Sequence, residues 1–226
     1  MEKLLITIDG PAGAGKTTIS RQLAEVLEYI YVDTGALYRG IACMAGKAGL
    51  DVNNRALLSD FLEKLHLEFR WQDKQLQLFA DGLDITGEIR TQEVSMGASQ
   101  VAAIPEVRAY LLSFQKRLGS EKAAVFEGRD MGTVVFPEAD VKFFLTADSR
   151  VRAMRRYEEL PEATRPLFDE VLQDIEKRDT LDRERALAPL VPAEDAIQLD
   201  TSNLPLDALL DIMLDHVRQK AAKSQV

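Results

Sequence analysis

The stretch Gly10-Pro11-Ala12-Gly13-Ala14-Gly15-Lys16-Thr17 matches the pattern G-x-x-x-x-G-K-[ST]. An apolar run, Leu4–Ile8, precedes it and predicts a buried strand, and residues Thr18–Leu27 predict a helix. A glycine-rich loop between a strand and a helix lets backbone N–H groups surround a polyphosphate, and the helix N-terminus adds partial positive charge. The stretch therefore predicts a nucleoside triphosphate site. The alternative is a glycine-rich turn without a ligand.

Two side chains of this loop have predicted roles in phosphate chemistry. Lys16 can reach the β- and γ-phosphates, and the Thr17 hydroxyl can bind Mg²⁺. Asp33, which follows the next predicted strand, is a further candidate metal ligand. The residues predicted to bind the triphosphate are Gly10, Pro11, Ala12, Gly13, Ala14, Gly15, Lys16, Thr17 and Thr18. The motif by itself does not say where the phosphate goes.

Composition limits the possible partners and compartments. The 226 residues suit one α/β domain with a small insert. A net charge of −9 gives no overall positive surface, so we expect neither nucleic acid nor a membrane as a partner. Cys43 is the only cysteine, which excludes an intramolecular disulfide and a cysteine-based zinc site. The N-terminal apolar run is too short for a signal sequence or a membrane span, so we expect a cytoplasmic protein.

Five short apolar runs alternate with helical patterns along the chain. They are Leu4–Ile8, Tyr29–Val32, Ala123–Phe126, Val141–Leu145 and Ala196–Leu199. This alternation predicts an α/β fold with a five-stranded parallel sheet of buried strands and flanking helices. Polar residues follow each run, and ligands of open α/β sheets bind outside the carboxyl ends of the strands. We therefore expect the site at that edge.

Residues 65–86 depart from this scheme. Leu65, Leu67, Phe69 and Trp71 alternate with polar residues, and turns are predicted at 73–74 and 81–82. The pattern predicts a small antiparallel β insert. It is either a decoration or a region over an acceptor, and we favour the second because long ordered inserts near active sites usually serve function. Helices are predicted over 92–118, divided at Pro105, and over 150–160, 167–185 and 206–220.

Arginines gather on one of these predicted helices, and they are Arg150, Arg152, Arg155 and Arg156. Phosphoryl transfer depends on positioning and on charge neutralisation, which guanidinium groups supply. Beside a phosphate-binding loop, the cluster predicts a short mobile helical lid that closes on the transferring phosphate. The alternative is a solvated helix face whose arginines pair with Glu158 and Glu159.

Two further charged segments follow the same logic. Arg178, Asp182 and Arg185 share one face of a predicted helix, and a surface ladder of salt bridges explains their spacing equally well. The segment Glu127–Thr133 directly follows a predicted buried strand. A charged pair between two glycines at the carboxyl end of a strand favours a binding site over a structural turn.

Six separated segments together resemble the bacterial cytidylate kinases. In order, they are Asp9–Lys16, Asp33–Arg39, Gly87–Thr91, Ala98–Ala102, Glu127–Pro137 and Arg178–Pro192. The resemblance covers nearly the whole chain. It implies a P-loop kinase fold and the transfer of the γ-phosphate of ATP, with Mg²⁺, to CMP or dCMP.

The resemblance also implies a division of labour within a single kinase domain over residues 1–226. The core is expected at about 1–60, 120–148 and 186–226, the acceptor-binding region with the insert at about 61–119, and the lid at about 149–170. We expect a monomer.

By the same resemblance, individual residues receive roles. Arginines are expected to bind the acceptor phosphate, and they are Arg39, Arg129 and Arg185. Arg178 and Asp182 are expected near the ribose. The residues expected around the base are Thr34, Ser99, Arg108 and Asp130. The residues expected to act in catalysis are Lys16, Arg129, Arg152, Arg156 and Arg185. Two roles stay open for Glu127: contact with a water molecule bound to Mg²⁺, or a purely structural role. A carboxylate at Asp130 can accept from N4 of cytosine, whereas uracil would present an acceptor there, so we expect CMP to be preferred over UMP.

Three other functions compete with this interpretation. A regulatory GTPase is disfavoured because the chain has no N-K-x-D segment for guanine recognition. Another small kinase, acting on AMP, dTMP or a metabolite such as shikimate, fits the loop and lid but not the segments at 129–130 and 178–185. A sensor that binds ATP without turnover is disfavoured by Lys16, Thr17 and the lid arginines together.

Overall fold

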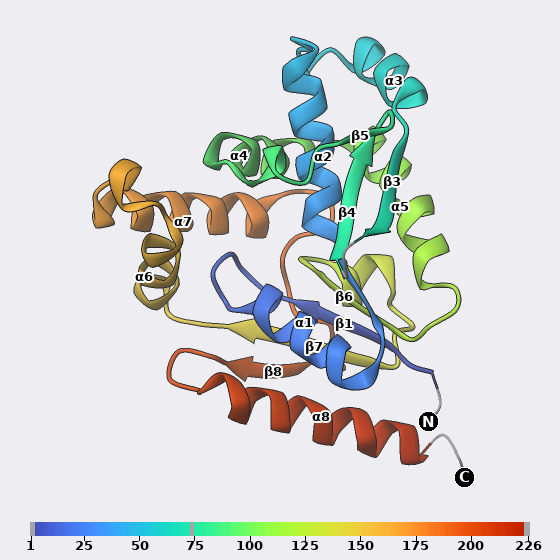
Figure 1. Cartoon of the computed structure of the whole chain (residues 1–226), viewed down its shortest axis with the longest axis vertical. Coiled ribbons are helices and arrows are strands. Elements are labelled where there is room, and N and C mark those ends of the chain that lie inside the picture. Colours follow the sequence, from blue (N-terminus) through green and yellow to red (C-terminus); the bar gives the residue numbers. More distant parts are fainter. Residues whose placement is uncertain (1–2, 73–74, 224–226) are drawn as a thin grey trace. The chain divides into compact units, whose positions relative to one another are not determined.

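The computed structural model describes residues 3–72 and 75–223 (Figure 1). The turn predicted at 73–74 lies outside these residues. By their contacts, the residues form two compact units, one made of 1–32 and 119–226 and the other of 33–118.

The first unit is built on a five-stranded sheet with the strand order β2-β6-β1-β7-β8. Its strands are β1 (Leu5–Asp9), β2 (Ile30–Asp33), β6 (Ala124–Gly128), β7 (Val141–Thr146) and β8 (Ile197–Asp200). Strand β1 pairs in parallel with β6 and β7, and β7 pairs in parallel with β8. The predicted α/β class is confirmed, and every strand starts at its predicted residue or one residue later.

The prediction that all five strands are buried is wrong at the two edges of the sheet. Every residue of β1 and β6 is buried, whereas β2 buries only Val32 and β8 has no buried residue. The reason is topological, since β2 and β8 each have a neighbouring strand on one side only. Apolar content predicted the strands correctly, but it could not distinguish central strands from edge strands.

Two helices and a π-helical turn cover the sheet. Helices α1 (Lys16–Leu27) and α8 (Leu206–Lys223) contact each other and pack on one face, where Ile6, Ile8 and Phe143 meet Leu23 and Met213. Burying each such side chain stabilises the fold by roughly 1.5–3 kcal/mol. On the other face lies the π-helical turn η2 (Met131–Val135), next to which the rings of Phe126 and Phe136 are 4.6 Å apart.

Between β7 and β8 the chain forms two helices joined by a short turn. They are α6 (Ser149–Glu159) and α7 (Phe168–Glu184), and the turn η3 (Glu162–Thr164) lies between them. The two helices pack on each other through Ala153, Val171 and Ile175, with the ring of Tyr157 edge-on to Phe168. Both helices confirm the sequence prediction.

The second unit contains helices and a small sheet. Its elements are α2 (Thr34–Lys47), α3 (Arg55–Lys64), β3 (Leu67–Gln72), β4 (Gln75–Ala80), β5 (Leu83–Asp84), η1 (Glu88–Arg90), α4 (Gln92–Val101) and α5 (Pro105–Gly119). The three strands pair antiparallel in the order β3-β4-β5, so the predicted insert is confirmed. Pro105 starts α5, as predicted.

Helix α2 is the centre of the second unit. It packs on α4 and β4, and Leu37 and Ile41 are fully buried among Leu78 and Val107. At its start, the Asp33 carboxylate accepts from the Ala36 N–H at 3.1 Å. Such a cap satisfies a backbone donor that the first helical turn leaves unpaired. Residues 33–60, expected in the core, belong to this unit. The division into core, acceptor-binding region and lid is functional and stays a prediction.

The tight approach of Gly10 to β7 makes a stability prediction. Its φ is +147°, and a Cβ there would overlap the carbonyl oxygen of Leu145. We expect Gly10→Ala to lower the free energy of unfolding by about 3 kcal/mol in urea denaturation. Gly46→Ala is the control, because a Cβ on Gly46 meets nothing within 4 Å and the helix gains propensity. Equal stability of both variants would contradict the prediction.

Candidate active site

The phosphate-binding loop joins β1 to α1 and leaves the helix N-terminus open. Gly13 and Gly15 have φ values of +76° and +85°, in the left-handed region. Gly15 is the N-cap of α1, and no side chain among the described residues caps this helix. The first N–H groups of α1 are therefore available to an anion, together with the partial positive charge of the helix end.

Lys16 lies buried at the base of this loop. Its Nζ donates to the Pro11 carbonyl oxygen at 2.7 Å. Burial, and next the positive charge of Arg129, lower the pKa of Lys16 to about 7, although the Glu127 carboxylate opposes the shift. The side chain thus loops back onto the backbone of its own motif. A polyphosphate would supply the negative charge that holds the lysine protonated.

Glu127, at the end of β6, brings a carboxylate next to the loop. Its Oε1 accepts from the Thr17 hydroxyl and from the Tyr31 hydroxyl, each at 2.8 Å. The carboxylate is buried, with 4% of Glu127 exposed. A hydroxyl and a carboxylate side by side are hard oxygen ligands of the kind that Mg²⁺ prefers. The residues present therefore fit a magnesium ion bound with ATP.

Asp33, the further candidate metal ligand, is engaged within the second unit. Besides capping α2, its carboxylate accepts from Arg39 Nη2 at 2.7 Å. The guanidinium of Arg39, which is predicted to hold the acceptor phosphate, therefore has Asp33 as a carboxylate partner. The metal role of Asp33 stays a prediction.

Asp9 ties the end of β1 to the segment that follows β6. Its two oxygens accept from the backbone N–H groups of Met131 and Gly132, at 2.9 and 2.8 Å. Burial raises the pKa of Asp9 to about 6, against these two hydrogen bonds. These two hydrogen bonds fix the start of the π-helical turn η2, directly after Arg129 and Asp130. In the sequence, Asp9 starts the first segment that carries the resemblance, but nothing in the sequence predicts this role.

The predicted residues of the first unit gather into one buried charge cluster. Arg129 Nε donates to Asp182 Oδ2 at 2.8 Å, and Arg185 Nη2 lies 3.6 Å from Asp130 Oδ1. Burial opposes ionisation of Asp182, but the charges of Arg129, Arg178 and Arg185 outweigh it and lower its pKa. Three guanidinium groups thus meet the carboxylates of Asp130 and Asp182, and the charges of Glu127 and Asp9 also act on Arg129. Their N–H groups are donors suited to an anion.

The same cluster decides between the two interpretations of the segment at 178–185. Asp182 is only 3% exposed, and the side chain of Arg185 is 5% exposed. A surface ladder of salt bridges would leave these side chains in solvent. The alternative of a solvated ladder is therefore wrong for Asp182 and Arg185.

The predicted base-binding residues of the second unit occupy three of its helices. Thr34 is buried at the start of α2. Ser99 lies on α4, and its buried hydroxyl finds no hydrogen-bond partner among the described residues. Arg108, on α5, donates from Nη1 to the Ala102 carbonyl oxygen at 3.3 Å. A buried hydroxyl without a partner is costly, so Ser99 has the property expected of a ligand-binding group.

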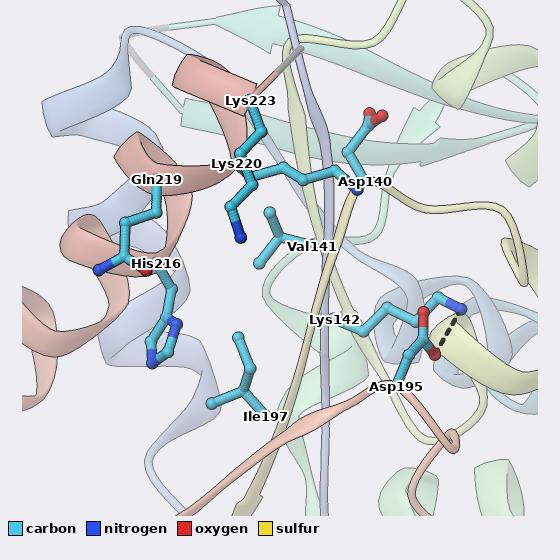
Figure 2. Close-up of a pocket in the computed structure, with 9 residues that line it drawn as sticks. All are labelled: Asp140, Val141, Lys142, Asp195, Ile197, His216, Gln219, Lys220 and Lys223. Carbon is cyan, nitrogen blue, oxygen red and sulfur yellow. Dashed lines mark hydrogen bonds and ion pairs between the residues drawn. The ribbon is translucent and has the colours of Figure 1, made fainter.

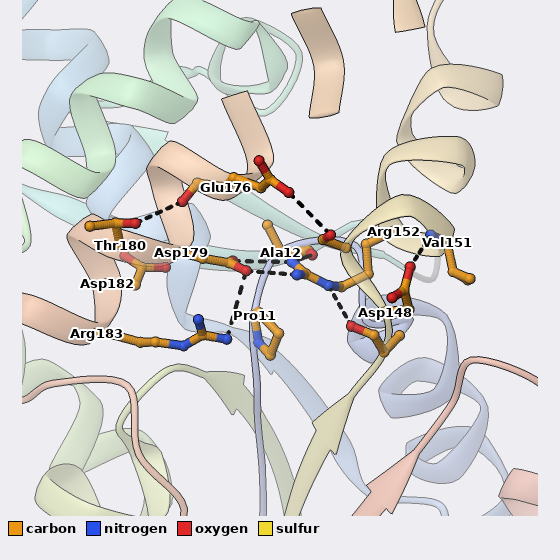
Figure 3. A network of polar contacts seen from close by, with 12 residues as sticks. Pro11, Ala12, Asp148, Val151, Arg152, Glu176, Asp179, Thr180, Asp182 and Arg183 are labelled. Atoms are coloured by element: carbon orange, nitrogen blue, oxygen red, sulfur yellow. Dashed lines mark hydrogen bonds and ion pairs between the residues drawn. The ribbon is translucent and has the colours of Figure 1, made fainter. Parts of the chain in front are cut away.

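The four predicted lid arginines of α6 differ in their surroundings. Arg150 is exposed, and its guanidinium lies 5.6 Å from the centre of the Phe168 ring. Arg152 is buried and pairs with Asp179 through two hydrogen bonds of 3.1 and 2.6 Å (Figure 3). Arg155 donates from Nη2 to the Thr201 carbonyl oxygen at 2.6 Å. Arg156, in contrast, makes an exposed ion pair with Glu159 at 3.2 Å. The solvated alternative therefore describes Arg156 and is wrong for Arg152.

A further hollow of the first unit lies between β7, β8 and α8 (Figure 2). It is lined by Asp140, Val141, Lys142, Asp195, Ile197, His216, Gln219, Lys220 and Lys223. Lys142 donates to Asp195 at 2.8 Å and to the Pro137 carbonyl oxygen at 2.5 Å, so its charge is balanced locally. Asp140 and Ile197 border or begin strands at their amino ends. Ligands of such sheets bind at the opposite ends.

Residues 3–72 and 75–223 lack two features. No group of three or more His, Cys, Asp and Glu side chains there could hold a metal ion by itself. No helix in this part of the chain has both the length and the apolar character needed to cross a membrane.

The open helix end after β1, the buried Lys16 and the arginine cluster place the protein among the P-loop phosphotransferases. The family model described as Cytidylate kinase matches residues 6–219. The chain belongs to the cytidylate kinase family, and it is an ATP-dependent phosphotransferase, as predicted from the sequence.

Individual relatives support this assignment over nearly the full length. A cytidylate kinase of Enterobacter sp. (strain 638) is 45% identical over 219 residues, which is 96% of each chain. A cytidylate kinase of Fervidobacterium nodosum is 45% identical over 216 residues, 95% of this chain and 96% of the relative. Among solved structures, an uncharacterized protein from Eubacterium ventriosum superposes with a TM-score of 0.53 at 12% identity, covering 96% and 99% of the two chains. This last likeness concerns the fold alone.

The lowered pKa of Lys16 predicts that triphosphate binding takes up protons above about pH 7. Near pH 8 the lysine is largely neutral in the free enzyme, and the phosphates favour its charged form. Calorimetry of ATP binding in two buffers with different ionisation enthalpies measures the uptake. Lys16→Arg keeps its charge at this pH, so its uptake should be smaller by the contribution of the lysine. Equal uptake by both proteins would contradict the assignment.

Proposed function

We propose that the protein transfers the γ-phosphate of ATP to CMP or dCMP, giving CDP or dCDP and ADP. The transfer is in line and forms no covalent intermediate, because phosphoryl transfer requires positioning and charge neutralisation more than a protein nucleophile. The observation that carries the proposal is the buried cluster of Arg129, Arg178 and Arg185 around Asp182. The cluster offers guanidinium groups to an anion, and it lies in the same unit as the phosphate-binding loop.

The donor is bound by the loop after β1. The N–H groups of Gly13 to Thr18 surround its phosphates, and Lys16 leaves the Pro11 carbonyl to contact the β- and γ-phosphates. The Thr17 hydroxyl, held by Glu127 at 2.8 Å, is oriented to bind Mg²⁺ that arrives with ATP. The ion would neutralise charge between the phosphates. The hydrogen bond to Glu127 fixes the rotamer of Thr17, which supports a positioning role for this carboxylate.

Each unit offers guanidinium groups for an acceptor phosphate, Arg129 and Arg185 in the first unit and Arg39 in the second. Guanidinium groups bind a phosphate dianion through paired hydrogen bonds. Each of the three has a carboxylate neighbour, Asp182, Asp130 and Asp33 respectively. The carboxylates keep the arginines oriented, and Arg178 and Asp182 of the same cluster contact the ribose.

The base is read by side chains that can both donate and accept. Ser99 has a buried hydroxyl without a partner among the described residues, and Arg108 supplies a donor for N3 or O2 of cytosine. Thr34 adds a second buried hydroxyl. Asp130 accepts from the N4 amino group. Uracil would turn an acceptor toward this carboxylate, and the mismatch of two acceptors in a dry site is costly.

Arg156 is the lid arginine best suited to neutralise charge that develops during transfer. Its pair with Glu159 is exposed, and such pairs contribute little, about 0–1 kcal/mol. The guanidinium can therefore turn toward a phosphate at small cost. Arg152 would have to leave a buried carboxylate and two backbone carbonyls to do the same.

We further infer that the protein works as a cytoplasmic monomer without nucleic acid or membrane partners. The net charge of −9 supports this, because it opposes binding to polyanionic surfaces.

The test of the reaction is ADP release from ATP and Mg²⁺ with a panel of acceptors: CMP, dCMP, UMP, AMP, dTMP and shikimate. We expect turnover with CMP and dCMP and little with the other acceptors. Comparable turnover of UMP would keep the kinase but remove the account of base selection. Turnover of AMP or shikimate alone would overturn the proposed substrate class, and ATP binding without any turnover would indicate a sensor.

Asp130 provides a sharper test of base selection. We expect Asp130→Ala to lower the ratio of kcat/KM for CMP to that for UMP by about tenfold or more. Loss of the Arg185 contact affects both acceptors alike and cancels in the ratio. Asp130→Asn is the matched variant: its amide can donate to O4 of uracil, so the ratio should fall at least as far. An unchanged ratio in both variants would remove Asp130 from the base site.

A further inference from the structure

We infer that Arg152 and Asp179 form a positioning pair, which holds the outer side of the phosphate-binding loop in the shape that binds ATP without touching the nucleotide. The inference rests on the proposed use of that loop for ATP. It gives Arg152 a different role from the charge neutralisation predicted by the sequence, and it gives Asp179 a function that the resemblance did not assign.

The pair connects three separate pieces of the first unit. Asp179 on α7 accepts from Nη1 and Nη2 of Arg152 on α6, at 3.1 and 2.6 Å. The same Nη1 donates to the Ala12 carbonyl oxygen of the loop at 3.1 Å, and Nε donates to the Ala147 carbonyl oxygen at 2.8 Å. Figure 3 shows the Arg152 guanidinium beside both Asp179 and Ala12. The side chain of Arg152 therefore joins the phosphate-binding loop and helix α6 to helix α7.

Neighbouring contacts hold the outer side of the loop in the same way. The carbonyl oxygen of Gly13 accepts from Arg155 Nη1 at 3.3 Å, and that of Ala14 accepts from the Thr201 hydroxyl at 3.0 Å. The three successive carbonyls at 12–14 are thus held by side chains outside the loop. A peptide carbonyl and its N–H point in opposite directions. Carbonyls that are held on the outer side therefore leave the loop's N–H groups on the inner side, where a backbone nest binds an anion.

The packing between α6 and the loop leaves little room for movement. A Cβ on Gly13 would lie 2.9 Å from the Cβ of Arg152. The side chains of Arg152 and Asp179 are 3% and 6% exposed. If Arg152 turned away toward a phosphate, Asp179 would remain buried and its main counter-charge would be lost, which is strongly unfavourable. The pair is therefore kept during the reaction, and its effect on ATP passes through the loop backbone.

The position of Asp179 adds a link to the acceptor side. It lies on α7 directly after Arg178 and within the same helix as Asp182, the residues assigned to the ribose. A displaced Asp179 would move the helix that carries them. The pair thus connects the loop that binds the donor to the helix that binds the acceptor, through rigid, buried contacts.

The experiment measures ATP affinity directly, by calorimetry without acceptor, and kcat and KM separately for each substrate. Asp179→Asn keeps the shape of the side chain but removes its charge, and Arg152→Lys keeps the charge but loses the paired geometry. For both we expect the dissociation constant and the KM of ATP to rise about tenfold or more. The double variant should be no worse than the more severe single one, because both act on one unit.

Arg183→Ala is the matched control. Arg183 approaches the same Asp179 oxygen at 3.9 Å, but its side chain is 61% exposed, so its removal should change ATP affinity less than twofold. Thermal unfolding of all variants distinguishes misfolding from loss of positioning. Asp179→Glu supplies a second measure, since a longer carboxylate restores charge and should recover part of the affinity.

Two results would overturn the inference. If Arg152 contacts the transferring phosphate itself, Arg152→Lys lowers kcat while ATP affinity stays the same, and Asp179→Asn leaves kcat unaffected. If the pair is only structural, both variants lower the unfolding temperature with unchanged ATP affinity. Since ATP binding is measured without acceptor, an error in the proposed acceptor would leave this test intact.

Discussion

Buried positive charge at the phosphate-binding edge of the sheet is the constraint on which the rest of the structure depends. An acidic chain must gather cations in one place to bind a nucleotide, and each cation removed from water needs a counter-charge. Asp182 faces Arg129, Asp130 faces Arg185, and Asp179 faces Arg152. The carboxylates come from α7 and from the segment after β6, so satisfying the charges also fixes how these elements pack.

The same constraint shapes the loop after β1. Its backbone must present N–H groups to phosphates, so its carbonyls need partners elsewhere. Arg152, Arg155 and Thr201 supply them for the carbonyls of residues 12–14. Asp9 lies one residue before the loop, and its carboxylate accepts hydrogen bonds from the backbone N–H groups of Met131 and Gly132. Donor loop and arginine-bearing segment are therefore held by one continuous set of buried contacts.

Sequence patterns predicted the regular elements well because those patterns are local. Apolar runs gave five strands, alternation gave the insert, and Pro105 marked the start of α5. Helices α2 and α3 received no individual prediction, although Asp33 and Asn54 are recognisable caps three residues before the N–H groups that they accept. Edge and central strands differ in their neighbours alone, a property that no single strand contains.

The sequence by itself determined the class of protein: the loop motif, the strand-to-helix order around it and six ordered segments identify a nucleotide kinase. It also named Arg129, Asp182 and Arg185 as members of a site. Only the tertiary structure decided which charges are buried and what they face. Spacing along a helix tells which residues share a face, but not whether that face meets solvent or a carboxylate from another helix. Arg152 and Arg156 are four residues apart on α6, yet Arg152 is buried against Asp179 of α7 and the loop, whereas Arg156 forms an exposed ion pair with Glu159 of its own helix.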